Sequence, residues 1–204
     1  MKIILVQSRH IDAVAEIFCL AFENSITFFT PMTQKVKNAM KDIFHLLHRV
    51  FGQGFFIAVE NNEVCGYIVM ADDIKRLWLQ AVTSGFLKKA MVSTISGKYG
   101  LTLPTLYKIV KNKLLYFRFE MTTKPSAQVL SIGVQPERHG EGIGQELLAK
   151  GIQYIESLGI KRIKLEARPD NIPAVKIYEK YGFRTVGETK DIQGKWLIMM
   201  REEK

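Results

Sequence analysis

Three glycines at alternate positions, Gly140, Gly142 and Gly144, stand directly before a helical pattern of apolar residues. Glycine inside a regular element costs about 0.5–1 kcal/mol relative to alanine, so a need for bare backbone is expected here. The first N–H groups of a helix lack partners within the helix, and the helix dipole adds partial positive charge at that end. Without Cβ atoms in the way, a phosphate can reach these donors. The segment predicts a phosphate-binding turn between a strand and a helix, although a simple flexible turn gives the same pattern.

The spacing around the glycines excludes two common phosphate loops. A Walker loop continues with Lys and then Ser or Thr after its last glycine, whereas Gln145 and Glu146 follow here. A dinucleotide fingerprint is G-x-G-x-x-G, whereas this chain has G-x-G-x-G. The ligand must therefore be identified from the rest of the chain.

The order of the expected elements indicates a single mixed α/β domain over residues 1–204. Apolar spacing predicts helices at 12–22, 33–51, 146–158 and 173–181. Strands are expected at 2–7, on both sides of the turn pair Asn61-Asn62, and at 127–134, 163–167, 183–186 and 196–200, with a loop at 24–31. Gly133 inside its strand indicates a bulge or a close backbone approach. An insertion at about 74–122 consists of helical pieces.

Composition narrows the class of protein. The N-terminal apolar run is too short for a signal peptide, and no apolar stretch has the length of a membrane span. Cys19 and Cys65 both lie in apolar segments and are expected to be buried free thiols, which favours a cytoplasmic protein. The four histidines and two cysteines show no metal-ligand spacing, so no metal is expected.

The positive charge is concentrated in one segment. The chain has 29 basic and 20 acidic residues, and its formal net charge is +9. Residues 74–118 contain nine basic residues and no acidic one, so the remainder of the chain is neutral. A solvated basic face explains such a run. Interleaved aromatic residues also allow an anionic partner, whether nucleic acid, an acidic lipid surface or an acidic acceptor.

Three segments together resemble the GCN5-related N-acetyltransferases. "LSIGVQPERHGEGIGQELL" is similar to the acetyl-CoA motif of that family, "LEARPDNIPAVKIYEKYGF" to its later strand–Asn–helix–Tyr segment, and "FFIAVENNEVCGYI" to its central hairpin. The layout, with a helical insertion before the glycine strand, is similar to the puromycin-acetyltransferase-like branch. The resemblance implies a mixed, mostly antiparallel sheet that is splayed at its centre and flanked by helices.

The resemblance also implies acetyl-CoA as the acetyl donor and assigns its contacts. The pyrophosphate would lie at the turn formed by Arg138, His139, Gly140, Glu141, Gly142, Ile143, Gly144 and Gln145. Ile132, Gly133 and Val134 would offer backbone hydrogen bonds to the pantetheine arm, with Gly133 in the bulge that splays the strands. Asn171 would bond the same arm, or cap the following helix. His139 departs from the Arg or Gln that is usual in the family.

Acetyl transfer requires a base for the amine and an acid for the leaving thiolate. By the same resemblance, Tyr178 would be the general acid and Glu166 the base, acting directly or through a water. An amphipathic core tyrosine and a solvated strand carboxylate are the structural alternatives for these two residues. Tyr181 is expected to pack in the core instead.

The acceptor is expected to be a primary amine of a small molecule. A protein or peptide amino group is the alternative, because "LEAR" is similar to the ribosomal-protein alanine acetyltransferases. A non-catalytic module that binds CoA or nucleic acid is a third hypothesis. Residues 24–33 and the insertion would determine acceptor choice. The sequence leaves a homodimer open.

Overall fold

The computed structural model describes residues 1–102, 104–108 and 127–203. Its centre is a seven-stranded sheet with strand order β1-β2-β3-β4-β5-β7-β6. Neighbouring strands are antiparallel except for the parallel pair β4 and β5. The strands are β1 (Lys2–Leu5), β2 (Phe55–Glu60), β3 (Glu63–Ala71), β4 (Ala127–Val134), β5 (Arg162–Ala167), β6 (Arg184–Asp191) and β7 (Gly194–Glu202). The expected mixed, mostly antiparallel fold class is confirmed.

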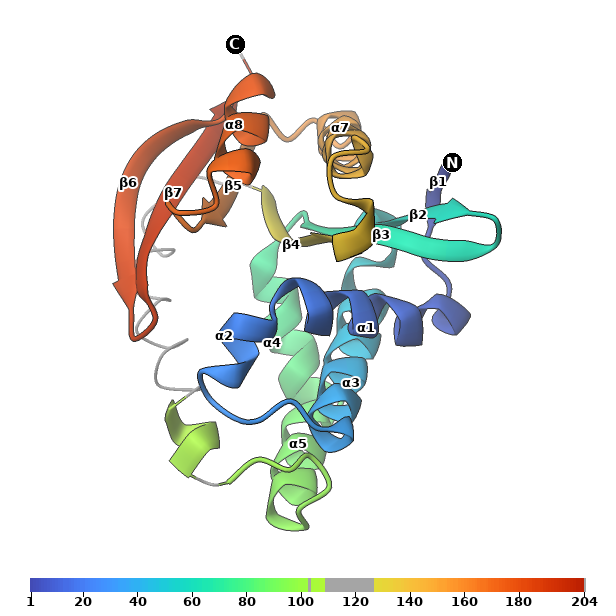
Figure 1. Ribbon diagram of the computed structural model, residues 1–204, viewed down its shortest axis with the longest axis vertical. Coiled ribbons are helices and arrows are strands. Elements are labelled where there is room, and N and C mark those ends of the chain that lie inside the picture. The colour runs from blue at the N-terminus through green and yellow to red at the C-terminus, as the bar shows by residue number, and fades with distance from the viewer. Residues whose placement is uncertain (103, 109–126, 204) are drawn as a thin grey trace.

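Helices cover both faces of this sheet (Figure 1). On one face lie α7 (Ile143–Ser157) and α8 (Ile172–Lys180). The opposite face carries α1 (Ile11–Ala21), α2 (Glu23–Thr27), α3 (Gln34–Phe51), α4 (Ile74–Thr83) and α5 (Phe86–Ile95). Short 3-10 turns occupy Ser8–His10, Gly52–Gly54 and Pro136–Arg138.

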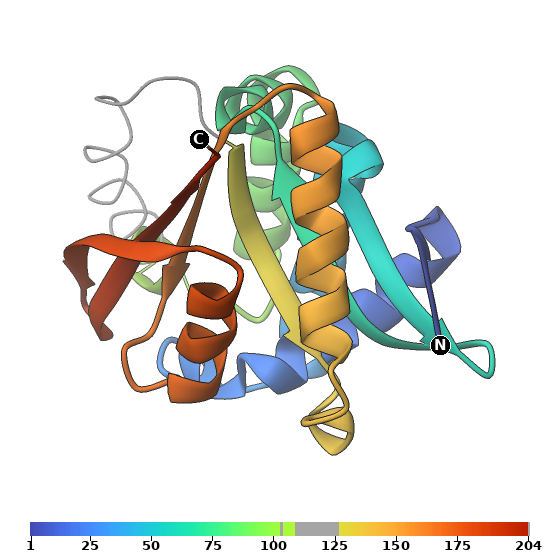
Figure 2. The same ribbon diagram turned by 90° about the horizontal axis from the view of Figure 1, so that it is seen from above.

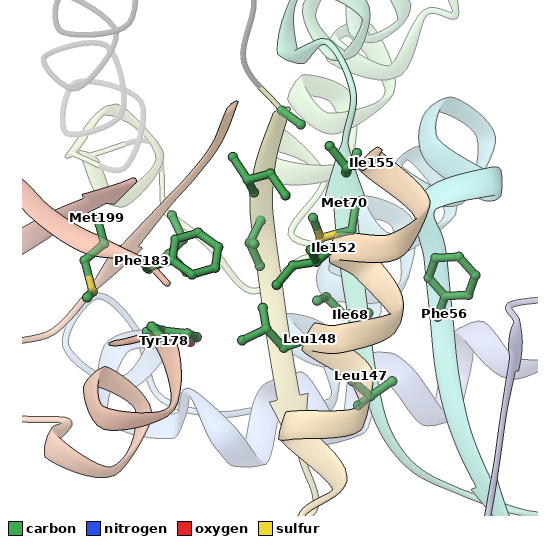
Figure 3. Packing of buried hydrophobic residues seen from close by; sticks show 14 of the residues in the cluster. Phe56, Ile68, Met70, Leu147, Leu148, Ile152, Ile155, Tyr178, Phe183 and Met199 are labelled. Atoms are coloured by element: carbon green, nitrogen blue, oxygen red, sulfur yellow. The ribbon is translucent and has the colours of Figure 1, made fainter. Parts of the chain in front are cut away.

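Each face of the sheet has its own hydrophobic core, because side chains alternate along every strand. Leu147, Leu148 and Ile155 of α7 pack against Ile68 and Met70 of β3 in the first core, which Figure 3 shows. The second core lies under α1 and α3. Its large fully buried side chains include Phe44, Phe55 and Tyr67.

The sheet opens between β4 and β5. These strands pair at Ala127 with Ile163 and at Gln128 with Lys164, and no further pair joins them. The remaining length of β4, up to Val134, therefore has a ladder with β3 on one side only. Alternate backbone N–H and C=O groups on the other side face the opening.

The bulge in β4 lies three residues away from the expected glycine. Val69 pairs with Ser131 and Met70 with Val129, so Leu130 is the extra residue. Gly133 pairs regularly with Tyr67, and a Cβ at Gly133 would lie 2.8 Å from Cε1 of the Tyr67 ring. The expectation that Gly133 forms the bulge was therefore wrong. The missing side chain at Gly133 instead leaves space for the buried ring of Tyr67.

Two helices differ in extent from the sequence expectation. A short helix, α2, occupies part of the expected loop at 24–31, because the chain bends at Phe22 and re-forms a helical turn at once. The helix α7 begins at Ile143, three residues earlier than expected, with Gly142 as its N-cap. The hairpin turn is confirmed, since Asn61 and Asn62 both have positive φ values, 50° and 68°.

The insertion is only partly described. It contains α4 and α5, which Gly85 separates with a φ of +73°, and the basic residues Lys111, Lys113 and Arg118 lie outside the described residues. None of the helices that the structure describes is both long and apolar enough to cross a membrane. Cys19 and Cys65 are both buried free thiols. The described residues contain no group of three or more side chains suited to a metal ion.

Candidate active site

The glycine turn leaves the first backbone donors of α7 accessible. Gly140 and Gly142 have φ values of +89° and +83°, a backbone conformation that residues other than glycine rarely adopt. A Cβ at either position would meet nothing within 4 Å, so the space above the turn is open. No side chain caps α7 at Gly142. Uncapped donors at the positive end of a fifteen-residue helix suit a phosphate group.

The third glycine has a different role. Gly144 lies inside the first turn of α7 with a helical backbone, and a Cβ there would make an ordinary 3.7 Å contact with Val134. Backbone conformation therefore requires glycine at 140 and 142, whereas the folded chain would accept alanine at 144. The alternate spacing in the sequence did not distinguish these cases.

Arg138 and His139, both expected at the cofactor, bind the protein itself. Arg138 donates to Glu60 and Glu141 and, at 3.0 Å, to the Sγ atom of Cys65. The guanidinium hydrogen bond holds the pKa of Glu60 below its usual range. His139 bonds the Val134 carbonyl through its ring, at 3.2 Å, and its backbone N–H donates to Pro136. These side chains thus stabilise the turn between β4 and α7. The positive charge of Arg138 is neutralised by the carboxylates of Glu60 and Glu141.

A cation that the sequence analysis missed lies at the turn instead. The Lys180 ammonium, at the end of α8, donates to Oε1 of Gln145 at 2.8 Å. Lys180 makes no ion pair with a carboxylate in the described part of the chain. The separation of thirty-five positions between the partners explains why local spacing gave no signal for this contact.

The three β4 residues expected at the pantetheine arm lie along the opening to β5. Ile132 and Val134 pack their side chains on the α7 core, and Gly133 is buried over Tyr67. Their backbones pair with Ile68, Tyr67 and Gly66 of β3 on one side only. The groups on the other side can bond an extended chain that lies in the opening.

Tyr178 has a buried ring and a reachable hydroxyl. Its ring packs 6.2 Å from that of Phe183, and the side chain points from α8 toward β4 and α7 (Figure 3). The hydroxyl has no hydrogen-bond partner within the described residues, yet it is not among the fully enclosed polar atoms. Burial raises the pKa of Tyr178 to about 12, so the phenol keeps its proton at neutral pH. The competing Tyr181 is partly buried against the same core.

Glu166 lies on the opposite face of β5 from Tyr178. Its neighbours Leu165 and Ala167 point into the α7 core with Tyr178, so Glu166 points to the other side. Its carboxylate is largely buried and forms an ion pair with Lys164 at 3.0 Å. Because β4 and β5 separate beside it, a group held in the opening can be approached from both faces.

Asn171 caps α8. Its Oδ1 atom accepts from the Ala174 N–H at 3.3 Å, which satisfies one free donor at the helix start. Its expected bond to the pantetheine arm would use the amide nitrogen.

Four further residues form a cluster just beyond the end of β5. Arg168, the first residue after β5, stacks over the Trp196 ring at 4.9 Å and donates to the carbonyl of Gln193 at 2.7 Å. The Gln193 amide in turn donates to the Ser25 carbonyl of α2 at 2.7 Å. The Trp196 Nε1–H is enclosed and has no partner among the described residues. This cluster therefore joins the β6–β7 hairpin to α2.

The fold therefore places an uncapped start of α7 beside an opening between β4 and β5. Residues 12–183 match the acetyltransferase (GNAT) family, and the chain belongs to this family, whose enzymes use acetyl-CoA.

A curated relative with a matching segment is also named as an acetyltransferase. The chain is 35% identical over 63 residues to a mycothiol acetyltransferase of Saccharomonospora viridis, a match that covers 31% of this chain and 21% of the relative. The chain thus spans about a fifth of the length of that relative.

Solved structures share the fold across the chain. A ribosomal-protein-alanine N-acetyltransferase from Brucella melitensis has a TM-score of 0.63 at 15% identity, covering 100% of both chains. A putative acetyltransferase from Salmonella typhimurium, solved with its cofactor acetyl-CoA, has a TM-score of 0.60 at 15% identity, covering 98% and 92%. At these identities the likeness shows the fold alone.

Proposed function

We propose that this protein transfers an acetyl group from acetyl-CoA to the primary amine of a small molecule. The carrying observation is the opening between β4 and β5, which the uncapped start of α7, Tyr178 and Glu166 border. Acetyl-CoA would supply the acetyl group as a thioester. The N–H donors of α7 would hold its pyrophosphate, and the free side of β4 would hold its pantetheine arm.

Two residues at the opening would act as general base and general acid in the proposed reaction. Glu166, directly or through a water, would accept the proton that the acceptor ammonium must lose before its nitrogen can attack. The adjacent Lys164 ammonium disfavours a second cation at this place and so favours the neutral amine. As the C–N bond forms and the C–S bond breaks, the Tyr178 hydroxyl would donate its proton to the departing sulfur.

The cluster at the end of β5 favours a small acceptor. Its contact between Gln193 and Ser25 joins the β6–β7 hairpin to α2, which would restrict a polypeptide at that side of the Glu166 face. The similarity to a mycothiol acetyltransferase supports a small acceptor as well.

A substrate panel tests this proposal. Full-length protein with acetyl-CoA is assayed for free thiol against small primary amines and against peptides with free amino groups. We expect turnover with small primary amines, and little with peptides. Gln193→Ala, which detaches the hairpin from α2, should raise the relative rate with peptides. Preferential turnover of peptides by the unaltered chain would support a protein acceptor instead.

A further inference from the structure

The helices α4 and α5 expose an unusual amount of aliphatic surface. Six side chains on their outer sides are each between 47% and 66% exposed, namely Leu79, Val82, Leu87, Met91, Val92 and Ile95. We call this set the α4–α5 outer face. Scattered single apolar residues are normal on a protein surface, but six strongly exposed ones on two successive helices indicate an interaction site.

The pattern in α5 is the reverse of an ordinary surface helix. Ser93 and Thr94 are only 5% and 4% exposed and face the protein, while Met91 and Ile95 face outward. Thr94 satisfies its hydroxyl on the Ala90 carbonyl at 2.9 Å. A helix that buries its hydroxyls and exposes its aliphatic residues is placed so that the apolar side meets something outside the domain.

Lysines stand in the same outward rows as these apolar residues. Lys75 precedes Leu79 and Val82 at helical spacings of four and seven, and Lys88 precedes Met91, Val92 and Ile95 at three, four and seven. Neither lysine has a carboxylate partner in the described part of the chain. The flanking cations differ, because Arg76 pairs with Asp72 and Lys89 with Asp42.

We propose that the α4–α5 outer face docks on the surface of an anionic lipid bilayer. The aliphatic side chains would enter the boundary between headgroups and acyl chains, and Lys75 and Lys88 would lie at the lipid phosphates. Residues 74–118 contain no Asp or Glu that would be repelled there. Nucleic acid accounts for the lysines but not for the aliphatic surface, which a bilayer explains together with the charge.

The α4–α5 outer face lies away from the glycine turn of the candidate active site. Figure 2 shows α4 and α5 on the opposite side of the sheet from the turn that leads into α7. A protein docked through the α4–α5 outer face would therefore keep its glycine turn accessible. The proposal is independent of the acetyl transfer reaction.

Sedimentation with lipid vesicles tests the docking. Full-length protein is mixed with vesicles of phosphatidylcholine alone or of phosphatidylcholine with phosphatidylglycerol. We expect binding to the anionic vesicles that weakens as salt rises, and little binding to phosphatidylcholine alone. Lys75→Gln/Lys88→Gln should weaken anionic binding roughly 25-fold, about fivefold per lysine. The charge-matched Lys161→Gln/Lys190→Gln should leave it nearly unchanged.

The contribution of the aliphatic side chains to vesicle binding is tested with a second matched pair of variants. Leu79→Gln/Met91→Gln/Ile95→Gln should abolish vesicle binding, whereas Leu20→Gln/Leu158→Gln/Val186→Gln, at exposed apolar positions elsewhere, should not. Circular dichroism shows that each variant is folded. Equal binding by both triple variants, or no preference for anionic vesicles, would overturn the proposal. So would self-association in light scattering that only the first triple variant loses, because a second copy would then be the occupant.

Discussion

At the scale of single residues, the proposed chemistry depends on Tyr178 of α8 and Glu166 of β5, which lie on opposite faces of the sheet. Tyr178 shares the α7 core with Phe183, and Glu166 shares the other face with Lys164. A tyrosine in a core is usually structural, so its hydroxyl decides its role. That hydroxyl is neither bonded within the described residues nor fully enclosed, which suits a proton donor beside the opening.

The change Tyr178→Phe tests this role. It removes the proton and keeps the ring in place, so kcat should fall about 10²–10⁴-fold while the Kd for acetyl-CoA changes little. Because burial raises the pKa of Tyr178 to about 12, the wild-type rate should show no loss from tyrosine ionisation between pH 9 and pH 10.5. Steady-state rates across this range, with acetyl-CoA binding measured separately, provide the readout.

Tyr181→Phe is the matched control, since Tyr181 lies nearby and only packs against the core. It should keep nearly full activity. Wild-type rates in the Tyr178→Phe protein, under conditions where chemistry limits turnover, would assign Tyr178 to packing alone.

At the scale of elements, glycines with different duties lie on either side of the turn between β4 and α7. Gly133 lets β4 lie over the Tyr67 ring, whose hydroxyl bonds Ser131 at 2.7 Å and so holds the ring in place. Gly140 and Gly142 shape the turn, and Gly144 lies in a helix that would accept a side chain. Because Tyr67 is fully buried, its ring has no room to move away from a Cβ added at Gly133.

The pair Gly133→Ala and Gly144→Ala tests this distinction. The first places a Cβ 2.8 Å from the Tyr67 ring and should lower the free energy of unfolding by about 1–3 kcal/mol. The second adds an ordinary contact inside a helix and should be neutral or raise it by up to about 1 kcal/mol. Urea unfolding of both variants gives the comparison. Equal stabilities would show that Tyr67 can move aside.

The sequence was sufficient for elements that local patterns define. Periodicity located α1, α3 and β5 to within a residue or two, and Asn61-Asn62 located the hairpin. Contacts between distant segments had no such signal. The approach of Tyr67 to Gly133, the Lys180 contact at Gln145 and the closure of Gln193 on Ser25 join residues far apart in the chain, and only the folded sheet brings them together.

At the scale of the whole molecule, the sheet divides the protein into two sides with separate duties. The α7 side provides the helix start and Tyr178, and the other side provides Glu166, the cluster at Trp196 and the α4–α5 outer face. The two sides meet where β4 and β5 separate. Cofactor and acceptor would therefore approach the reacting atoms from different directions.

The most direct test of the account is the affinity of the protein for acetyl-CoA, measured by calorimetry in two matched glycine variants. Gly142 and Gly159 stand at opposite ends of α7, with φ values of +83° and +73° and no atom within 4 Å of an added Cβ. An aspartate at either place brings similar backbone strain, but only at Gly142 does its charge oppose a pyrophosphate at the helix start. The account predicts that Gly142→Asp weakens acetyl-CoA binding at least about tenfold, or about 1.4 kcal/mol, while Gly159→Asp retains wild-type affinity. Equal affinities in the two variants would contradict it.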